Sequence, residues 1–196
     1  TGSGNWAVLS GTFQLVSSTQ ANSALQNITP GNSVFVWTVR NGVCPTTSDT
    51  VSVAVSAIPS NAIVGINQTL CENATLVNVS ATAPTSGTGS WSVILGGGSI
   101  LSPTSATTQV TFNPGINSYA YTVTSGACPS SVDTAFVTID SVSAPAIAGN
   151  DLTICENATA ISLNATFVNY GIAQWTSLTP GISIVNPAQN NTAISG

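Results

Sequence analysis

The chain has 196 residues, of which only 4% are charged: one is Lys or Arg, six are Asp or Glu, none is His, and the net charge is −5. Nucleic acids and anionic membrane surfaces bind clusters of Lys and Arg, so this composition excludes both as partners. General acid–base and nucleophilic catalysis usually relies on His, Lys or paired carboxylates, and the few carboxylates here stand singly along the sequence. We therefore predict no catalytic residue and no enzyme activity.

The sequence repeats itself at a constant interval, which we call the repeat period. Cys44 and Cys128 lie one period apart, at matching places in two nearly identical stretches, VWTVRNGVCPTTSDTVSVAV and AYTVTSGACPSSVDTAFVTI. The motifs TLCENATL and TICENATA place Cys71 and Cys155 at the same spacing. Helical and leucine-rich repeats have units of about 20–47 residues, whereas this longer period suits the roughly 100 residues of an immunoglobulin-type β-sandwich.

The period divides the chain into three units. Residues 59–142 form one complete unit, residues 1–58 match the back part of a unit, and residues 143–196 match the front part of another. We therefore interpret the chain as a segment of a longer tandem array.

Apolar and polar residues alternate with a period of two, and no stretch is long enough to predict an amphipathic helix. The predicted fold class is all-β: tandem immunoglobulin-like β-sandwich repeats, with Greek-key connections expected. In the earlier copy of the repeated hairpin, Asn41-Gly42 is a strong signal for a tight turn. In the complete unit, strands are expected in chain order at 62–70, 76–83, 91–95, 99–101 and 107–112, followed by a closing hairpin of 119–123 and 132–140.

Aromatic residues recur at matching positions of the units. An inward-facing Trp on the third strand is the usual core anchor of an immunoglobulin-type sandwich. An aromatic residue that recurs in every unit is explained more simply by the needs of the fold than by ligand stacking. We therefore assign five residues to the core: Trp6, Trp37, Trp91, Tyr121 and Trp175.

The cysteines indicate disulfides and an oxidising compartment outside the cytoplasm. The sequence has no C-x-x-C spacing and no His, which argues against zinc and thioredoxin-like sites. We prefer a Cys71–Cys128 disulfide within the complete unit. In an ordinary sandwich, however, the first turn and the last hairpin lie at opposite poles, whereas the Cα atoms of a disulfide lie within about 7 Å. The alternative pairs cysteines of neighbouring units, Cys44 with Cys71 and Cys128 with Cys155.

We predict no metal site and no cofactor. The acid-rich spacing of calcium-binding loops and the Gly-rich spacing of phosphate-binding loops are both absent. One alternative stays open: a weak Ca²⁺ site between units, formed by Asp140 or Asp151 with carbonyl groups of the linker.

The motifs resemble the immunoglobulin-like and PKD-like repeats of very large Bacteroidota cell-surface proteins, most closely those of SprB-type gliding-motility adhesins. The resemblance covers essentially the whole chain. Asn67 stands where the typical first motif has an acid, and residues 171–173 read Gly-Ile-Ala in place of Gly-Thr-Gly. The segments that carry the resemblance are 65–71, 87–91 and 37–49.

This resemblance implies export by the type IX secretion system and attachment at the outer surface of the outer membrane. The expected function is a structural stalk or filament segment of a large adhesin used in surface attachment or gliding. Its expected partners are neighbouring repeats, extracellular surfaces or polysaccharides bound through other regions, and the outer-membrane motility and secretion machinery. The alternatives are a carbohydrate-binding module and the accessory stalk of a secreted enzyme.

Three Asp-Ser/Thr-aliphatic triplets resemble the O-glycosylation signal of Bacteroidota. They place the candidate hydroxyl groups at Thr50, Thr134 and Ser141. Strand parity predicts that Thr50 and Thr134 face away from the core, because Val51 and Ala135 are expected to face it. The competing interpretation is that Thr simply favours a β-strand.

Overall fold

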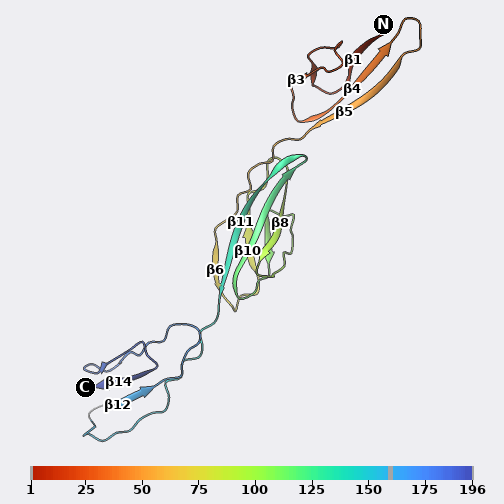
Figure 1. Cartoon of the computed structure of the whole chain (residues 1–196). Helices are drawn as coiled ribbons and strands as arrows, with labels where there is room; N and C mark the ends of the chain where they lie inside the picture. The colour runs from red at the N-terminus through yellow and green to blue at the C-terminus, as the bar shows by residue number, and fades with distance from the viewer. Residues whose placement is uncertain (1, 159–160, 196) are drawn as a thin grey trace.

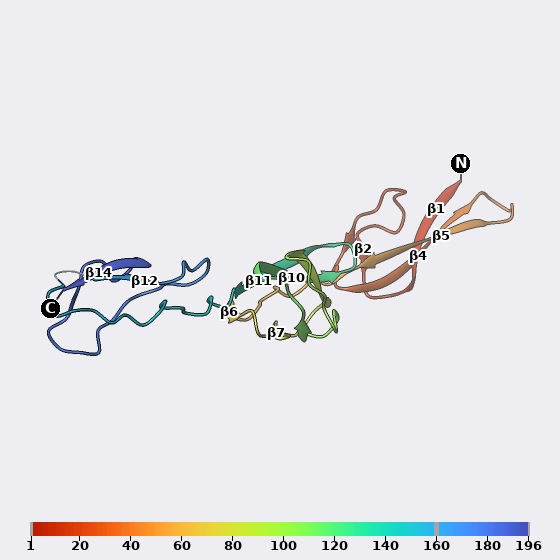
Figure 2. The same ribbon diagram turned by 90° about the horizontal axis from the view of Figure 1, so that it is seen from below.

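A computed structural model describes residues 2–158 and 161–195. Every regular element in these ranges is a β-strand, which confirms the all-β fold class with tandem immunoglobulin-like β-sandwich repeats. The strands form three lobes: β1 to β5, β6 to β11, and β12 to β14. Figures 1 and 2 show the lobes following one another in a row, with the two termini at opposite ends. In the part of the chain that the structure describes, no helix is long and apolar enough to cross a membrane.

The first lobe contains a three-stranded antiparallel sheet in the order β1-β4-β5. Phe35 of the central strand is buried, and so is Phe13 of the connection that follows β1. The strands are β1 (Ser3–Ser10), β2 (Gln14–Leu15), β3 (Leu25–Gln26), β4 (Gly31–Arg40) and β5 (Thr47–Val55), with β2 and β3 paired as a separate short ribbon.

The second lobe is a two-layered sandwich. One layer is a four-stranded sheet in the order β6-β11-β10-β8, in which β6 runs parallel to β11 and the other pairs are antiparallel. The other layer is the β7–β9 pair, extended by isolated bridges at Val64–Ala81 and Ile100–Val110. The strands are β6 (Gln68–Cys71), β7 (Val77–Ser80), β8 (Thr88–Leu95), β9 (Thr107–Val110), β10 (Gly115–Ser125) and β11 (Cys128–Asp140).

The core of this lobe lies between the two layers. Alternate residues of a strand point to the same face of a sheet, so β10 and β11 each contribute a row of inward side chains. Burying them removes apolar surface from water at roughly 25 cal/mol per Å². The buried residues of the cluster are Val77, Val79, Trp91, Val110, Tyr119, Tyr121, Val123, Ala135, Val137 and Ile139.

The alternation expected along β8 stops after Trp91. Strict alternation would place Val93 and Leu95 on the inward face with Trp91, but they are exposed (36% and 55%). The pairing of β8 with β10 shifts register between Val93 and Leu95, because Val93 pairs with Tyr119 and Leu95 with the preceding Ser118. Such a bulge changes which side chains face the core, so it explains the outward Leu95, whereas Val93 precedes it and lies at the edge of the core. The sequence pattern contains no sign of it.

The third lobe has three short strands in the order β12-β14-β13. Thr192 of β14 is buried. The strands are β12 (Ile161–Asn164), β13 (Ser183–Ile184) and β14 (Asn191–Ser195).

A buried tyrosine ties β10 to the loop before it. The Tyr119 side chain is fully buried, and its hydroxyl donates a hydrogen bond to the Thr111 carbonyl at 2.7 Å. A tyrosine that bonds back to an upstream carbonyl in this way, a tyrosine corner, is characteristic of immunoglobulin-type sandwiches. Burial also raises the pKa of Tyr119 above its usual value of 10.0. Its neutral form is therefore the one that the fold stabilises.

We expect Tyr119→Phe to lower the free energy of unfolding of the second lobe by about 1–2 kcal/mol, because the Thr111 carbonyl loses its donor. Denaturant titration with hydrogen exchange of peptides from residues 62–140 measures the change. The matched control is Tyr121→Phe, since the Tyr121 hydroxyl has no hydrogen-bond partner in the described residues. Equal losses in the two variants would contradict this role of the hydroxyl.

The wild-type protein should also lose stability as the pH rises above 10, because Tyr119 ionises more readily in the unfolded chain than in the folded one.

Candidate functional site

No metal centre is assembled in the described ranges. Among residues 2–158 and 161–195, no group of three or more His, Cys, Asp or Glu side chains is placed to hold a metal ion. Asp140 and Asp151, the candidates for a Ca²⁺ site between units, are both exposed. The candidate sites are therefore the recurrent aromatic residues, the proposed modification sites and the cysteines.

The recurrent aromatic residues form pairs across neighbouring strands. The rings of Trp91 and Tyr121 lie 5.0 Å apart at 50°, and both side chains are buried. In the first lobe, Trp6 and Trp37 stand in the same relation, 5.0 Å apart at 48°, but both are only half-buried. Tilted aromatic pairs at this distance stabilise a fold by roughly 0.5–1.5 kcal/mol beyond the area that they bury. The pair is thus a repeated packing unit.

The recurrent tryptophans Trp6, Trp91 and Trp175 each also hold a loop further along the chain in place. The backbone N–H groups of Trp6, Trp91 and Trp175 each donate a hydrogen bond of 2.7 Å to a loop carbonyl. The indole N–H donates to a second carbonyl of the same loop, at 3.2, 3.3 and 3.0 Å respectively. The sequence predicts that the recurrent tryptophan anchors the core. The alternation of apolar and polar residues does not predict that it also forms two hydrogen bonds with a loop further along the chain. The accepting residues are Ser18 and Ala21, Pro103 and Ala106, and Pro187 and Gln189.

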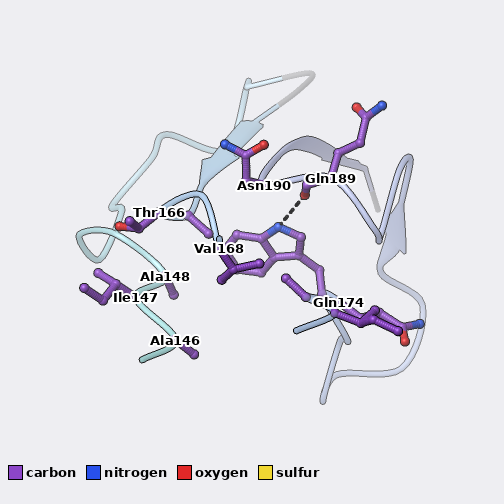
Figure 3. A pocket seen from close by; sticks show the side chains of 12 residues that line it. Ala146, Ile147, Ala148, Thr166, Val168, Gln174, Gln189 and Asn190 are labelled. Atoms are coloured by element: carbon purple, nitrogen blue, oxygen red, sulfur yellow. Dashed lines mark hydrogen bonds between the residues drawn. The ribbon is translucent and has the colours of Figure 1, made fainter. Parts of the chain in front are cut away.

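A cavity of about 310 Å³ lies beside Trp175 in the third lobe. Figure 3 shows the lining side chains around the indole ring, with its hydrogen bond to Gln189 as a dashed line. The lining residues Ala148 and Ala165 are the counterparts, one repeat period later, of Val64 and Ala81. In the second lobe those two residues pack against the buried core.

The cavity therefore lies where the second lobe has its hydrophobic core. In the second lobe the matching space is filled by side chains of β10 and β11, and residues 143–158 and 161–195 contain no counterpart of these strands. A second hollow of this lobe is lined by Ile161 and Leu163, the counterparts of the buried Val77 and Val79. We infer that these hollows are not ligand sites.

Asp133 forms hydrogen bonds that the sequence pattern does not predict. One carboxylate oxygen accepts the Thr134 N–H at 2.9 Å, and the other accepts the Val64 N–H at 2.9 Å. The Ser131 hydroxyl accepts the Ala62 N–H at 3.0 Å beside it. The Asp of the Asp-Thr motif therefore fastens segment 62–67 to the edge of β11. Its counterpart Asp49 makes the equivalent bond to its own neighbour, Thr50, at 2.8 Å.

The three candidate modification sites differ in exposure. Thr50 is exposed, whereas Thr134 and Ser141 are half-buried. In β11, Ala135 is buried, as strand parity requires of the residue next to an outward Thr134. In β5, Val51 is also exposed (45%), so the first lobe does not show the same alternation.

The structure does not bring the expected disulfide partners together. Cys71 pairs with Asp140 at the last residue of β11, whereas Cys128 is the first residue of the same strand. A strand rises about 3.3 Å per residue, so this 13-residue strand separates the two ends by roughly 40 Å. Disulfides need Cα atoms within about 7 Å. The preferred Cys71–Cys128 pairing is therefore incompatible with this fold, and all four cysteines are free thiols here.

The alternative pairings fail for the same reason. Cys44 lies in the turn between β4 and β5, and its amide donates to the Asn41 carbonyl at 3.1 Å. This turn is at the end of the first lobe that is remote from the second lobe, whereas Cys71 is at the far pole of the second (Figure 1). Cys128 and Cys155 are separated in the same manner, since each repeats the position of its counterpart one period earlier. Neither pair is a neighbour across a junction.

No family model matches this sequence, and no match to a curated protein is found. Solved structures with similar arrangements include the extracellular cadherin domains 1–4 of protocadherin gamma B7, with 12% identity and a TM-score of 0.40 over 97% of this chain and 57% of that one. The protocadherin gamma B4 extracellular domain has 14% identity and a TM-score of 0.43 over 98% of this chain and 38% of that one. Mouse cadherin-23 domains EC22–24 have 14% identity and a TM-score of 0.36 over 98% and 75%. The chain thus spans little more than half the length of the first of these structures.

We expect Asp133→Ala to destabilise the second lobe by roughly 1–3 kcal/mol, because two backbone N–H groups lose a charged acceptor. Hydrogen exchange of peptides from residues 62–67 and from β11 measures the loss. Asp49→Ala is the control: it has the same sequence context, but within the described residues its carboxylate accepts only the Thr50 N–H. The role assigned to Asp133 is wrong if the two substitutions have equal effects.

Proposed function

We propose that this chain is a load-bearing spacer of an extracellular adhesion-type protein, built from units of which residues 59–142 are one complete copy. The observation that carries the proposal is that the chain enters and leaves the second lobe at opposite poles. Segment 56–61 arrives beside the turn between β10 and β11, and the chain leaves after Asp140 at the other end of β11. Units connected from pole to pole extend a molecule by their full length.

The first junction is held against the second lobe rather than left free. Ser60 donates its backbone N–H and its hydroxyl to the Ser86 carbonyl, at 3.0 and 3.2 Å. The Ser86 hydroxyl donates back to the Ile58 carbonyl at 2.8 Å, and Pro59 between them is buried. A short segment that contains proline and is bonded on both sides of it resists bending. These contacts support a stiff connection between consecutive units.

The wider setting of this spacer follows from the motif resemblance. We place it in a giant cell-surface adhesin of Bacteroidota, exported by the type IX secretion system, attached to the outer membrane and used in surface attachment or gliding. Neighbouring repeats are its direct partners, and other regions of the protein contact extracellular surfaces, polysaccharides and the motility machinery. In a carbohydrate-binding module, exposed aromatics would form a repeated platform. Phe136 is 44% exposed, but its counterpart one period earlier is Ser52.

Small-angle X-ray scattering of proteins with one, two and three copies of residues 59–142 tests the spacer. We expect the maximum dimension to rise by roughly 40 Å for each added copy, the length of a 13-residue strand. Ser86→Ala in each copy removes a junction contact and should broaden the distribution of lengths, whereas Ser92→Ala on the exposed part of β8 should not. A dimension that does not grow with copy number contradicts the spacer. Saturable binding to a glycan array by the three-copy protein favours the carbohydrate-binding alternative.

We further propose that the spacer carries O-linked glycans at Thr50, Thr134 and Ser141, and that the exposed Thr50 is modified most completely. Intact-mass analysis of the protein expressed in a Bacteroidota host should show an excess over the sequence mass that decreases in Thr50→Ala. Ser52→Ala, on the same strand and also exposed, should keep the full excess. Wild-type protein with no excess mass contradicts the modification.

A further inference from the structure

A cysteine lies at each pole of the second lobe, and each is beside the chain that leads to a neighbouring lobe. Cys71 is the strand partner of Asp140, where the chain leaves toward the third lobe. The next residue, Glu72, donates its N–H to the Asp140 carbonyl at 2.9 Å, and its carboxylate accepts the Val142 N–H at 3.3 Å. Cys71 therefore belongs to the exit junction.

Cys128 belongs to the entry junction. Its Sγ lies 3.5 Å from the carbonyl oxygen of Ser56, the first residue after β5. The neighbouring Ala127 N–H donates to the Ser56 hydroxyl at 3.2 Å. Gly126 has a φ of +50°, and a Cβ at this position would collide with the Ser56 side chain. The turn is thus shaped to fit closely against the end of the preceding unit.

The repeat brings the contact of Cys71 with Asp140 and the contact of Cys128 with Ser56 to equivalent positions of the array. Ser56 precedes Asp140 by one repeat period, so it is the counterpart of Asp140 in the preceding unit. The strand partner of Asp140 is Cys71. A cysteine at the Cys71 position of the preceding unit is therefore the strand partner of Ser56, the residue that Cys128 touches.

Both cysteines lie close to the Ser56 position. Neighbouring strands of a sheet lie about 4.8 Å apart, which places the preceding unit's cysteine one strand spacing from Ser56. The Cys128 sulfur is within 3.5 Å of the Ser56 carbonyl. Disulfides join Cα atoms about 4.4–6.8 Å apart. Both cysteines are thus immediate neighbours of Ser56, and this shared neighbour is the observation on which the pairing rests.

We propose that each junction of the array is closed by a disulfide between the Cys71-position cysteine of one unit and the Cys128-position cysteine of the next. Cys71 bonds to the hairpin cysteine of the unit that begins at residue 143, and Cys128 to the first-turn cysteine of the unit that contains residues 1–58. Neither partner position falls within residues 1–196, so no two cysteines of this chain pair with each other. The pairing rests on the proposed tandem array.

The bond forms by thiol–disulfide exchange with an oxidised disulfide oxidoreductase of the compartment. Two cysteine S–H bonds break and one S–S bond forms between the units. The two electrons and two protons pass to the disulfide of the oxidoreductase, which is reduced to a dithiol. The product bridges the linker, so a pulling force at the junction is carried by two covalent connections instead of one.

A two-copy protein, residues 59–142 repeated in direct succession, tests the pairing. Residue 143 is the counterpart of residue 59, so the fusion preserves the natural spacing. Each copy keeps a complete core, because every member of the core cluster lies within residues 62–139. After oxidation by glutathione disulfide, monomers are isolated by size, alkylated and digested with pepsin at acidic pH, where thiols do not exchange. We expect one disulfide and two alkylated thiols per molecule.

Two matched variants identify the bonded cysteines. Cys71→Ser in the first copy should abolish the disulfide, whereas Cys71→Ser in the second copy should leave it intact. The substitution is the same in both, so a general effect on folding would appear in both. The proposal is overturned if neither variant loses the disulfide, if the second-copy variant loses it, or if the two-copy protein forms none. In the chain of residues 1–196, we expect all four cysteines to be alkylated, and a Cys71–Cys128 bond there would also overturn it.

These outcomes are separable from those of the spacer. If the maximum dimension grows with copy number but no junction disulfide forms, the pairing is wrong and the spacer stands. If the multi-copy proteins do not extend, the spacer itself is wrong.

Discussion

The second lobe depends on one long antiparallel pair, β10 and β11. These strands contribute more than half of the buried cluster, and the remaining strands of their sheet attach to their outer edges. The smaller β7–β9 layer covers the apolar face that the pair presents. Because β11 runs the length of the lobe from Cys128 to Asp140, it also fixes where the chain enters and where it leaves. The β10–β11 pair therefore determines the core, the length of the lobe and the positions of both junctions.

In this chain an uncharged polar side chain holds a turn through hydrogen bonds. Asn117 is completely buried, and it spans the turn before β10: its amide oxygen accepts the Asn113 N–H at 3.0 Å, and its amide nitrogen donates to the Asn113 carbonyl at 2.8 Å. Buried polar groups are tolerated when they are bonded in this way. Such bonds are indifferent to salt, unlike surface ion pairs, which are screened. The turn before β10 is thus held without dependence on ionic strength.

The sequence predicts much of the fold because its strongest signals are local. The alternation along β10 and β11, the turns that contain glycine, and the recurrence of whole motifs at the repeat period lead to the strands and to the repeat. The bulge that turns Leu95 outward was missed, because it depends on the pairing of β8 with β10. The bond between Asp133 and Val64 was missed for a similar reason, since it joins residues that are 69 positions apart.

The cysteines show how far sequence distance can mislead. Cys44 and Cys71 are close in the sequence, much less than one period apart, and were a natural candidate pair, yet they lie at the two outer poles of consecutive lobes. What decides proximity is the direction of β11: it carries the chain from the hairpin pole to the exit pole, so each hairpin cysteine faces the unit before it. Each first-turn cysteine then faces the unit after it. In the proposed array, with one cysteine of each kind per unit and all units oriented alike, the two kinds would meet only across a junction.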